Sequence, residues 1–247
     1  MALDAGVASL EDRYDATKPL KVSRFTIRDY HAKRRWLSVS EIFIYSSNIG
    51  SARLALEVGG EAQKVFLGDI GLLTPSEIEL PEVGAPIVPK IWRPVNTMTI
   101  GFGHGIAVSP LQMAAGVAAM VNGGVYRQPT LIKRAPGQIV LKRQVISERT
   151  SKKMRKLMRF VVEEGTGGRA DAPGYLVGGK TGTAEKSGSG GYRRKALLSS
   201  FVGTFPADDP RYVVFALLDE PKGNKKTHGY ATGGWVAAPI VGRVVRR

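Results

Sequence analysis

The last part of the chain holds three apolar, β-like runs that are joined by short connections. They cover residues 176–185, 197–205 and 212–218, and the second run is separated from the third by six residues, 206–211, which include the turn 206–210. A connection this short joins antiparallel neighbours, because parallel strands need a crossover of a dozen or more residues. The sequence therefore predicts an antiparallel sheet. A helix over 235–245 is expected to cover one face of it.

Two earlier stretches predict a pair of helices joined by a tight turn. Ser38 and Glu41 have the spacing of a capping box, in which the serine hydroxyl accepts a backbone N–H and the glutamate returns the bond. A helix is expected to begin there, and a second one over 49–58 is expected to end at Gly59. The residues 45–48, Tyr-Ser-Ser-Asn, then lie in the connection between the two helices.

Two further helices are expected before the sheet. Ser109 followed by Pro110 is typical of a helix start, so a helix should run over 110–121. The amphipathic stretch 148–164 predicts another helix, which ends at Gly165. Helices followed by an antiparallel sheet and a closing helix indicate the α+β class.

The composition agrees with one globular domain. The chain has 247 residues, of which 43% are apolar, which is enough to bury a core. We expect a single domain in which residues 1–174 are mainly helical, while residues 175–247 form the strands and the C-terminal helix. No stretch is long and apolar enough to cross a membrane, and the N-terminus lacks the features of a signal peptide.

Several classes of function are disfavoured by composition. A formal net charge of +15 suggests nucleic-acid binding, but the basic residues are dispersed and few aromatic residues accompany them, so nucleic acid is not an expected partner. The chain has no cysteine, so covalent catalysis must use oxygen or nitrogen. The three histidines, His31, His104 and His228, have no ligand-like spacing, so no metal site is expected.

Two short motifs carry the chemistry. Ser46-Ser47-Asn48 falls in the turn between the two early helices, and Lys180-Thr181-Gly182-Thr183 falls on the first predicted strand. Serine penicillin-recognising enzymes carry S-x-x-K, S-x-N and K-[ST]-G in that order, and this chain resembles them in the second and third motifs. Longer stretches are similar to the class B penicillin-binding proteins, and within that class to the cell-division enzyme. These stretches are 44–56, 100–124, 178–186 and 218–238.

The resemblance implies the fold of penicillin-binding transpeptidases and serine β-lactamases, with an antiparallel sheet flanked by helices and incomplete at the N-terminus. It also implies an acyl transfer that uses no cofactor. In the family, Ser46 would bridge hydrogen bonds between Lys180 and the lysine of S-x-x-K and relay protons to the nitrogen of the departing D-alanine. Asn48 would hold a substrate amide. Lys180 would place positive charge near the terminal carboxylate of the substrate. The catalytic residues implied are thus Ser46, Asn48 and Lys180.

The same resemblance assigns the substrate contacts to the strand. The hydroxyl groups of Thr181 and Thr183 are able to bond the carboxylate of the substrate. Gly182 leaves the strand surface bare, so an extended peptide can pair with its edge. The backbone N–H of Thr183 would be one donor to the oxyanion, and the nucleophile would supply the other.

The nucleophile motif is missing from the chain. No serine has a lysine three positions later; Ser151, for example, begins Ser-Lys-Lys-Met. The family places S-x-x-K shortly before the segment that Met1–Gly6 resembles, so we interpret the absence as truncation. The isolated chain is expected to be inactive, whereas the parent protein is expected to be an enzyme.

Two alternatives to the transpeptidase remain. A β-lactam sensor or β-lactamase would share the fold, although the E-x-x-x-N arrangement of class A β-lactamases is not found between the two motifs. Residues 174–181 also satisfy the P-loop pattern G-x-x-x-x-G-K-T. A P-loop follows a strand and opens a helix, however, and here the β-like residues fall inside the supposed loop.

The favoured interpretation is a peptidoglycan D,D-transpeptidase of septal cell-wall synthesis. The resemblance implies that its partners are pentapeptide stems ending in D-Ala-D-Ala, β-lactam antibiotics that mimic them, and other membrane proteins of division. It also implies a parent protein in the bacterial inner membrane with this domain in the periplasm. The chain itself contains neither anchor nor signal.

Overall fold

The computed structural model describes residues 1–247 except 23–24, 136–137, 139–140 and 189–190. Its chain divides into two compact units. Unit 1 holds Met1–Ile42 and Ser47–Met154, and unit 2 holds Phe43–Ser46 and Arg155–Arg247. Within the described ranges, no helix is both long and apolar enough to span a membrane.

Unit 1 is built around the helix α2 (Asn48–Val58), whose buried face consists of Ile49, Gly50, Ala52 and Ala55. Small residues let α4 approach closely: a Cβ at Gly101 would lie 2.6 Å from that of Ala55. The other helices of this unit are α3 (Gly60–Asp69), α4 (Pro94–Gly101) and α5 (Pro110–Val121).

The predicted helix starts are confirmed. The Ser38 hydroxyl accepts the Glu41 N–H over 3.2 Å and the Glu41 carboxylate accepts the Ser38 N–H over 2.9 Å, so the capping box precedes α1 (Val39–Tyr45). Ser109 and Gln112 form a second capping box at the start of α5.

Short antiparallel strands accompany these helices, and the sequence did not predict them. Three-residue strands have no measurable alternation of apolar and polar residues, so periodicity cannot reveal them. They pair as β1 (Arg13–Asp15) with β4 (Trp36–Ser38), β2 (Leu20–Val22) with β3 (Phe25–Ile27), and β5 (Val125–Arg127) with β6 (Lys142–Gln144).

Unit 2 contains the predicted antiparallel sheet, in the order β7-β8-β9. The strands are β7 (Gly178–Gly188), β8 (Gly191–Phe205) and β9 (Tyr212–Asp219). The first two are longer than expected, because main-chain pairing continues through polar residues with a register shift between Glu185 and Ser187. Positions 189–190, between these two strands, lie outside the described residues.

The helix α6 (Glu148–Glu163) confirms the expected amphipathic helix, and its second half belongs to unit 2. The single closing helix that was expected over 235–245 is wrong in one respect, because it is divided at Ala237 into α7 (Gly233–Val236) and α8 (Ala238–Val245). Pro239 explains the break, since it has no N–H to donate to the carbonyl four residues earlier.

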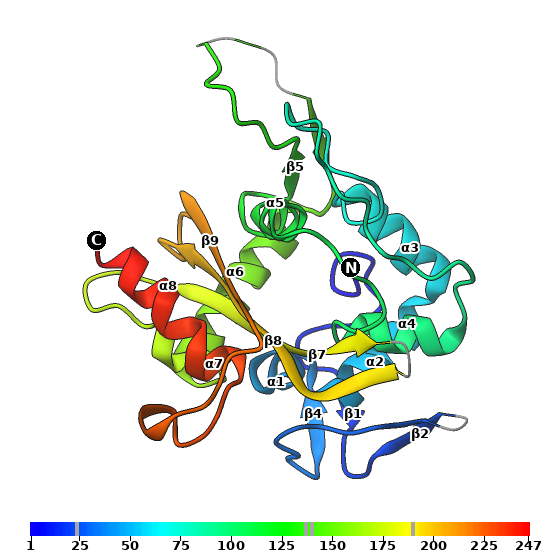
Figure 1. The fold of residues 1–247 in the computed structure, drawn as a ribbon. Helices are drawn as coiled ribbons and strands as arrows, with labels where there is room; N and C mark the ends of the chain where they lie inside the picture. Colours follow the sequence, from blue (N-terminus) through cyan, green and yellow to red (C-terminus); the bar gives the residue numbers. More distant parts are fainter. Residues whose placement is uncertain (23–24, 136–137, 139–140, 189–190) are drawn as a thin grey trace. The chain divides into compact units, whose positions relative to one another are not determined.

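The core of unit 2 lies between the sheet and these C-terminal helices, and Figure 1 shows α8 beside β8 and β9. Packing is close, since a Cβ at Gly203 on β8 would lie 2.5 Å from Cγ1 of Val241 on α8. The fully buried Phe201 lies at the centre of this core. Other buried members are Val162, Ala170, Ala172, Val177, Ala237, Ala238, Val241 and Val245.

Candidate active site

Ser46 occupies the turn after α1 with a left-handed backbone, φ 58°. This conformation costs a residue that has a Cβ about 1–2 kcal/mol. Its N–H reaches the carbonyl of Phe43 over 3.4 Å, which is a long and weak hydrogen bond. Non-glycine residues held in this region often belong to functional sites, so the strain at Ser46 supports a functional role for its side chain.

The side chain of Lys180 reaches this turn from β7. Its Nζ donates a hydrogen bond to Oγ of Ser46 over 2.8 Å and a second one to the carbonyl of Thr181 over 3.2 Å. Nζ also lies 5.8 Å from the centre of the Phe43 ring. The structure therefore brings together two predicted residues that are 134 positions apart in the sequence.

Burial lowers the pKa of Lys180 from 10.5 to about 8. The cause is desolvation, since burial removes the water that stabilises the protonated amine. A lysine with a pKa near 8 is mostly protonated at neutral pH and yet gives up its proton readily. Such a group is suited to proton exchange with the hydroxyl that it contacts.

Thr181 has a partner that the sequence did not identify. Its Oγ1 lies 2.7 Å from Oγ1 of Thr166, in the segment that follows α6. Two glycines flank Thr166, and a side chain at the first would collide with the backbone, since a Cβ at Gly165 would lie 2.6 Å from the carbonyl oxygen of Ile44. The run Gly-Thr-Gly was the available signal, but glycines of this kind are common in turns.

Thr183 is contacted by the residues that precede α7. Its Oγ1 accepts the N–H of Gly233 over 3.0 Å. A Cβ at Gly233 would lie 2.2 Å from the carbonyl of Ser200 and 2.4 Å from that of Gly182. Only glycine therefore fits at this position, and the start of α7 lies directly against β7.

β7 is an edge strand among the described residues, because β8 is its one neighbour in the sheet. Gly182 pairs with Ser200 and Thr183 pairs with Ser199. Along an edge strand every second residue directs its N–H and C=O away from the partner strand. An extended peptide is able to bind such groups by main-chain hydrogen bonds.

Asn48, the third predicted catalytic residue, belongs to unit 1, where it begins α2. Its Nδ2 donates to the carbonyl of Arg28 over 2.8 Å. The neighbouring Ser47 caps the helix by accepting the N–H of Gly50 over 3.1 Å, and Asp29 accepts from the Ser47 hydroxyl over 2.8 Å. The predicted contact of Asn48 with a substrate amide remains a prediction.

The structure does not support a P-loop at residues 174–181. Lys180 and Thr181 lie within β7, and the next element along the chain is the strand β8 rather than a helix. Across the described ranges, no group of three or more histidine, aspartate or glutamate side chains is arranged to hold a metal ion.

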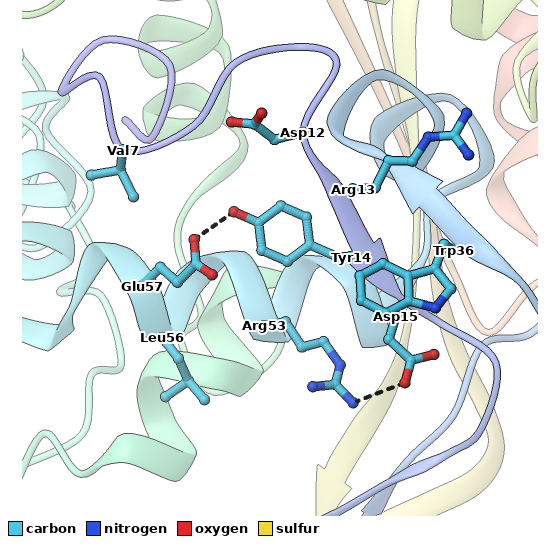
Figure 2. A pocket seen from close by; sticks show the side chains of 9 residues that line it. All are labelled: Val7, Asp12, Arg13, Tyr14, Asp15, Trp36, Arg53, Leu56 and Glu57. Atoms are coloured by element: carbon cyan, nitrogen blue, oxygen red, sulfur yellow. Dashed lines mark hydrogen bonds and ion pairs between the residues drawn. The ribbon is translucent and has the colours of Figure 1, made fainter.

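A cavity of about 640 Å³ lies in unit 1, and none of the predicted site residues lines it (Figure 2). Two contacts join polar groups of its lining: the Tyr14 hydroxyl donates to Glu57 over 2.5 Å, and Arg53 lies 3.9 Å from Asp15. Burial and the contact with Glu57 raise the pKa of Tyr14. The remaining lining residues are Val7, Asp12, Arg13, Trp36 and Leu56.

Comparison with known sequences agrees with this geometry. Residues 1–246 match the family model described as the penicillin binding protein transpeptidase domain. The chain is 45% identical over 256 residues to the probable peptidoglycan D,D-transpeptidase FtsI of Caulobacter vibrioides, covering 100% of this chain and 44% of that protein. It is 34% identical over 241 residues to the probable peptidoglycan D,D-transpeptidase PenA of Neisseria meningitidis, covering 96% of this chain and 40% of that protein.

Solved structures give the same result. The transpeptidase domain of Burkholderia pseudomallei penicillin-binding protein 3 superposes with a TM-score of 0.90 at 31% identity, covering 99% of this chain and 73% of that one. Penicillin-binding protein 3 of Mycobacterium tuberculosis in complex with ampicillin has a TM-score of 0.86 at 28% identity, covering 98% and 57% of the two chains.

The match extends over the whole chain, although the chain spans less than half the length of these two curated relatives. The fold predicted from the two motifs is confirmed. With the family model matched from the first residue to position 246, this chain belongs to the penicillin-binding protein transpeptidase domain family.

Proposed function

We propose that residues 1–247 form the proton-relay and substrate-binding part of a peptidoglycan D,D-transpeptidase of cell division. The hydrogen bond of 2.8 Å between Nζ of Lys180 and Oγ of Ser46 carries this proposal, because it joins the two motifs from which the function was predicted. The two relatives described above are both named probable peptidoglycan D,D-transpeptidases, which supports the proposal.

The reaction also needs a serine nucleophile, and the chain contains no S-x-x-K sequence. We therefore propose that the nucleophile is carried by a segment outside residues 1–247. By the full-length protein we mean the polypeptide that carries both that segment and this chain.

In the first half of the proposed reaction, the serine oxygen attacks the carbonyl carbon of the penultimate D-alanine. The bond from that carbon to the nitrogen of the terminal D-alanine breaks, and an ester to the serine remains. The proton of the serine passes to the departing amine, and Ser46, bonded to Lys180, is the relay for it. In the second half, an amine of a neighbouring stem attacks the ester and displaces the serine.

The strand residues bind the donor peptide. Lys180 supplies positive charge, and the hydroxyl groups of Thr181 and Thr183 are donors for the terminal carboxylate. The N–H of Thr183 is the proposed oxyanion donor within this chain. The open edge of β7 accepts the extended peptide, and Asn48 holds a substrate amide.

β-Lactams are proposed ligands of the same site, since the Mycobacterium tuberculosis relative is described in complex with ampicillin. We also propose that the full-length protein acts at the periplasmic face of the inner membrane, where its substrate lies, together with other division proteins. Co-purification of the full-length protein with division proteins from solubilised membranes would test the last point.

The test of the activity is the release of D-alanine from a synthetic peptide that ends in D-Ala-D-Ala. The full-length protein is expected to release it and, with an added amine, to form the transfer product. The Ser46→Ala variant should do so about 100-fold more slowly, which is the usual contribution of a proton-transfer group. Rapid turnover of a β-lactam without peptide cleavage would instead indicate a β-lactamase.

A further inference from the structure

Three side chains stack on one another beside the segment 230–235, which borders the strand β7. Trp235, in α7, lies between the guanidinium of Arg169 and the ring of Tyr230. The Arg169 carbon Cζ is 3.6 Å from the centre of the Trp235 ring, and the Tyr230 ring is 5.2 Å away with an interplanar angle of 17°. The ring of His228 meets Trp235 edge-on at 5.5 Å.

The guanidinium of Arg169 makes a cation–π contact with Trp235. Among the residues that the structure describes, no carboxylate lies within ion-pair distance of its guanidinium. A flat guanidinium over an indole is a favourable cation–π geometry, and lysine reproduces it poorly because its ammonium is compact and strongly hydrated. The stack is therefore the role that the structure gives to Arg169.

The segment 230–235 makes hydrogen bonds to both members of one residue pair in the sheet. Thr183 on β7 pairs with Ser199 on β8. The N–H of Gly233 donates to Oγ1 of Thr183 over 3.0 Å, and the buried Ser199 donates its hydroxyl to the carbonyl of Ala231 over 2.5 Å. Both partners of this pair are thus bound by residues that lie between Tyr230 and Trp235.

The hydrogen bond from Gly233 determines which further hydrogen bonds the Thr183 hydroxyl can make. A hydroxyl group has one proton to donate and two lone pairs that accept. Because Gly233 donates to the oxygen, it occupies a lone pair and leaves the proton free for an anionic acceptor. A carboxylate, which only accepts hydrogen bonds, is the acceptor that this arrangement favours.

We propose that Arg169 and Trp235 are positioning residues for recognition of the substrate carboxylate. They hold the N–H of Gly233 on Thr183, and Thr183 then donates its proton to the carboxylate. The inference rests on the proposed function, since it assigns a new role to residues that lie behind the same site.

The test uses the full-length protein and a penicillin, and it separates the dissociation constant of the initial complex from the acylation rate constant. Arg169→Ala should raise the dissociation constant about 10-fold, the effect of one misplaced hydrogen bond to a charged group, and change the acylation rate constant less than about twofold. Arg169→Lys should be similarly impaired, whereas Trp235→Phe, which keeps an aromatic face, should stay near wild type.

Arg211→Ala is the matched control, because Arg211 is an exposed arginine of unit 2 that pairs only with Asp209 among the described residues. It should leave both constants unchanged. With the methyl ester of the same penicillin, which has no carboxylate, the difference between wild type and Arg169→Ala should disappear. If the difference persists with the ester, the role in carboxylate recognition is contradicted.

Hydrogen exchange of the Gly233 amide gives a readout that does not depend on activity. It should be at least about 10-fold faster in Arg169→Ala than in wild type, because the variant loses the stack on Trp235 that holds the Gly233 N–H on Thr183. Unchanged exchange would contradict the proposal that Arg169 and Trp235 hold the Gly233 N–H on Thr183. Faster exchange with an unchanged dissociation constant would contradict their role in carboxylate binding. Failure of the wild-type protein to react with penicillin would contradict the proposed function. The exchange measurement would still test whether Arg169 and Trp235 hold the Gly233 N–H on Thr183.

Discussion

The Nζ of Lys180 donates a hydrogen bond of 2.8 Å to Oγ of Ser46, and the backbone of Ser46 is left-handed at φ 58°. The strained turn and the half-buried lysine form one arrangement. The turn directs the hydroxyl of Ser46 at an amine whose pKa is lowered to about 8.

Replacing Ser46 should separate stability from activity. Ser46→Gly removes the hydroxyl and also the left-handed strain, whereas Ser46→Ala removes only the hydroxyl. The glycine variant should therefore be about 1 kcal/mol more stable than the alanine variant. Both should release D-alanine about 100-fold more slowly than wild type. An alanine variant as stable as the glycine variant would show that the turn is not strained.

Gly233 should tolerate no side chain. An added Cβ would meet two backbone oxygens, at 2.2 and 2.4 Å, which cannot move without shifting the strands. Gly233→Ala should lower the free energy of unfolding by about 1–3 kcal/mol, as overpacking does. Gly84→Ala is the control, since nothing lies within 4 Å of its Cβ position, and it should stay within about 0.5 kcal/mol of wild type. Equal unfolding midpoints for the two variants would refute the close contact.

Ser47 should contribute to stability rather than to catalysis. It caps α2 through the N–H of Gly50 and also donates to Asp29, and it is 3% exposed. Ser47→Ala should lower the free energy of unfolding by about 1–2 kcal/mol, which chemical denaturation measures. Ser76→Ala, in the loop after α3, should have little effect. Loss of stability in both variants alike would argue against a specific cap.

The parts of the fold that depend on neighbouring residues could be predicted from the sequence. The capping box of Ser38 and Glu41 and the helix start at Ser109 need only neighbouring residues, and both are present. The break at Ala237 was missed because the apolar pattern continues across it, although Pro239 was the available signal.

The site was predictable only in part. The motifs indicated Ser46 and Lys180 through a family resemblance, because no spacing rule relates residues 134 positions apart. Thr166 and Arg169 were missed for the same physical reason: each acts through a side chain that is distant in the sequence, on Thr181 and on Trp235 respectively. Neither belongs to a motif.

The pKa of Lys180 predicts how acylation depends on pH. The amine is protonated below its pKa of about 8 and neutral above it, so its attraction for a carboxylate is lost as the pH rises through that value. The second-order rate constant for acylation by a penicillin should therefore fall above about pH 8. In Lys180→Arg the charge persists, so that slower variant should show no fall between about pH 7 and 9.5. The same fall in both proteins would assign the titration to another group.

The most direct test of the account is the acylation of the full-length protein by a fluorescent penicillin, with Lys180→Ala beside wild type. Wild type should be labelled covalently, and Lys180→Ala should be labelled about 100-fold more slowly, because it lacks both the partner of Ser46 and the charge facing the carboxylate. Residues 1–247 alone should not be labelled. Labelling of Lys180→Ala at the wild-type rate, or stable labelling of residues 1–247 alone, would contradict the account.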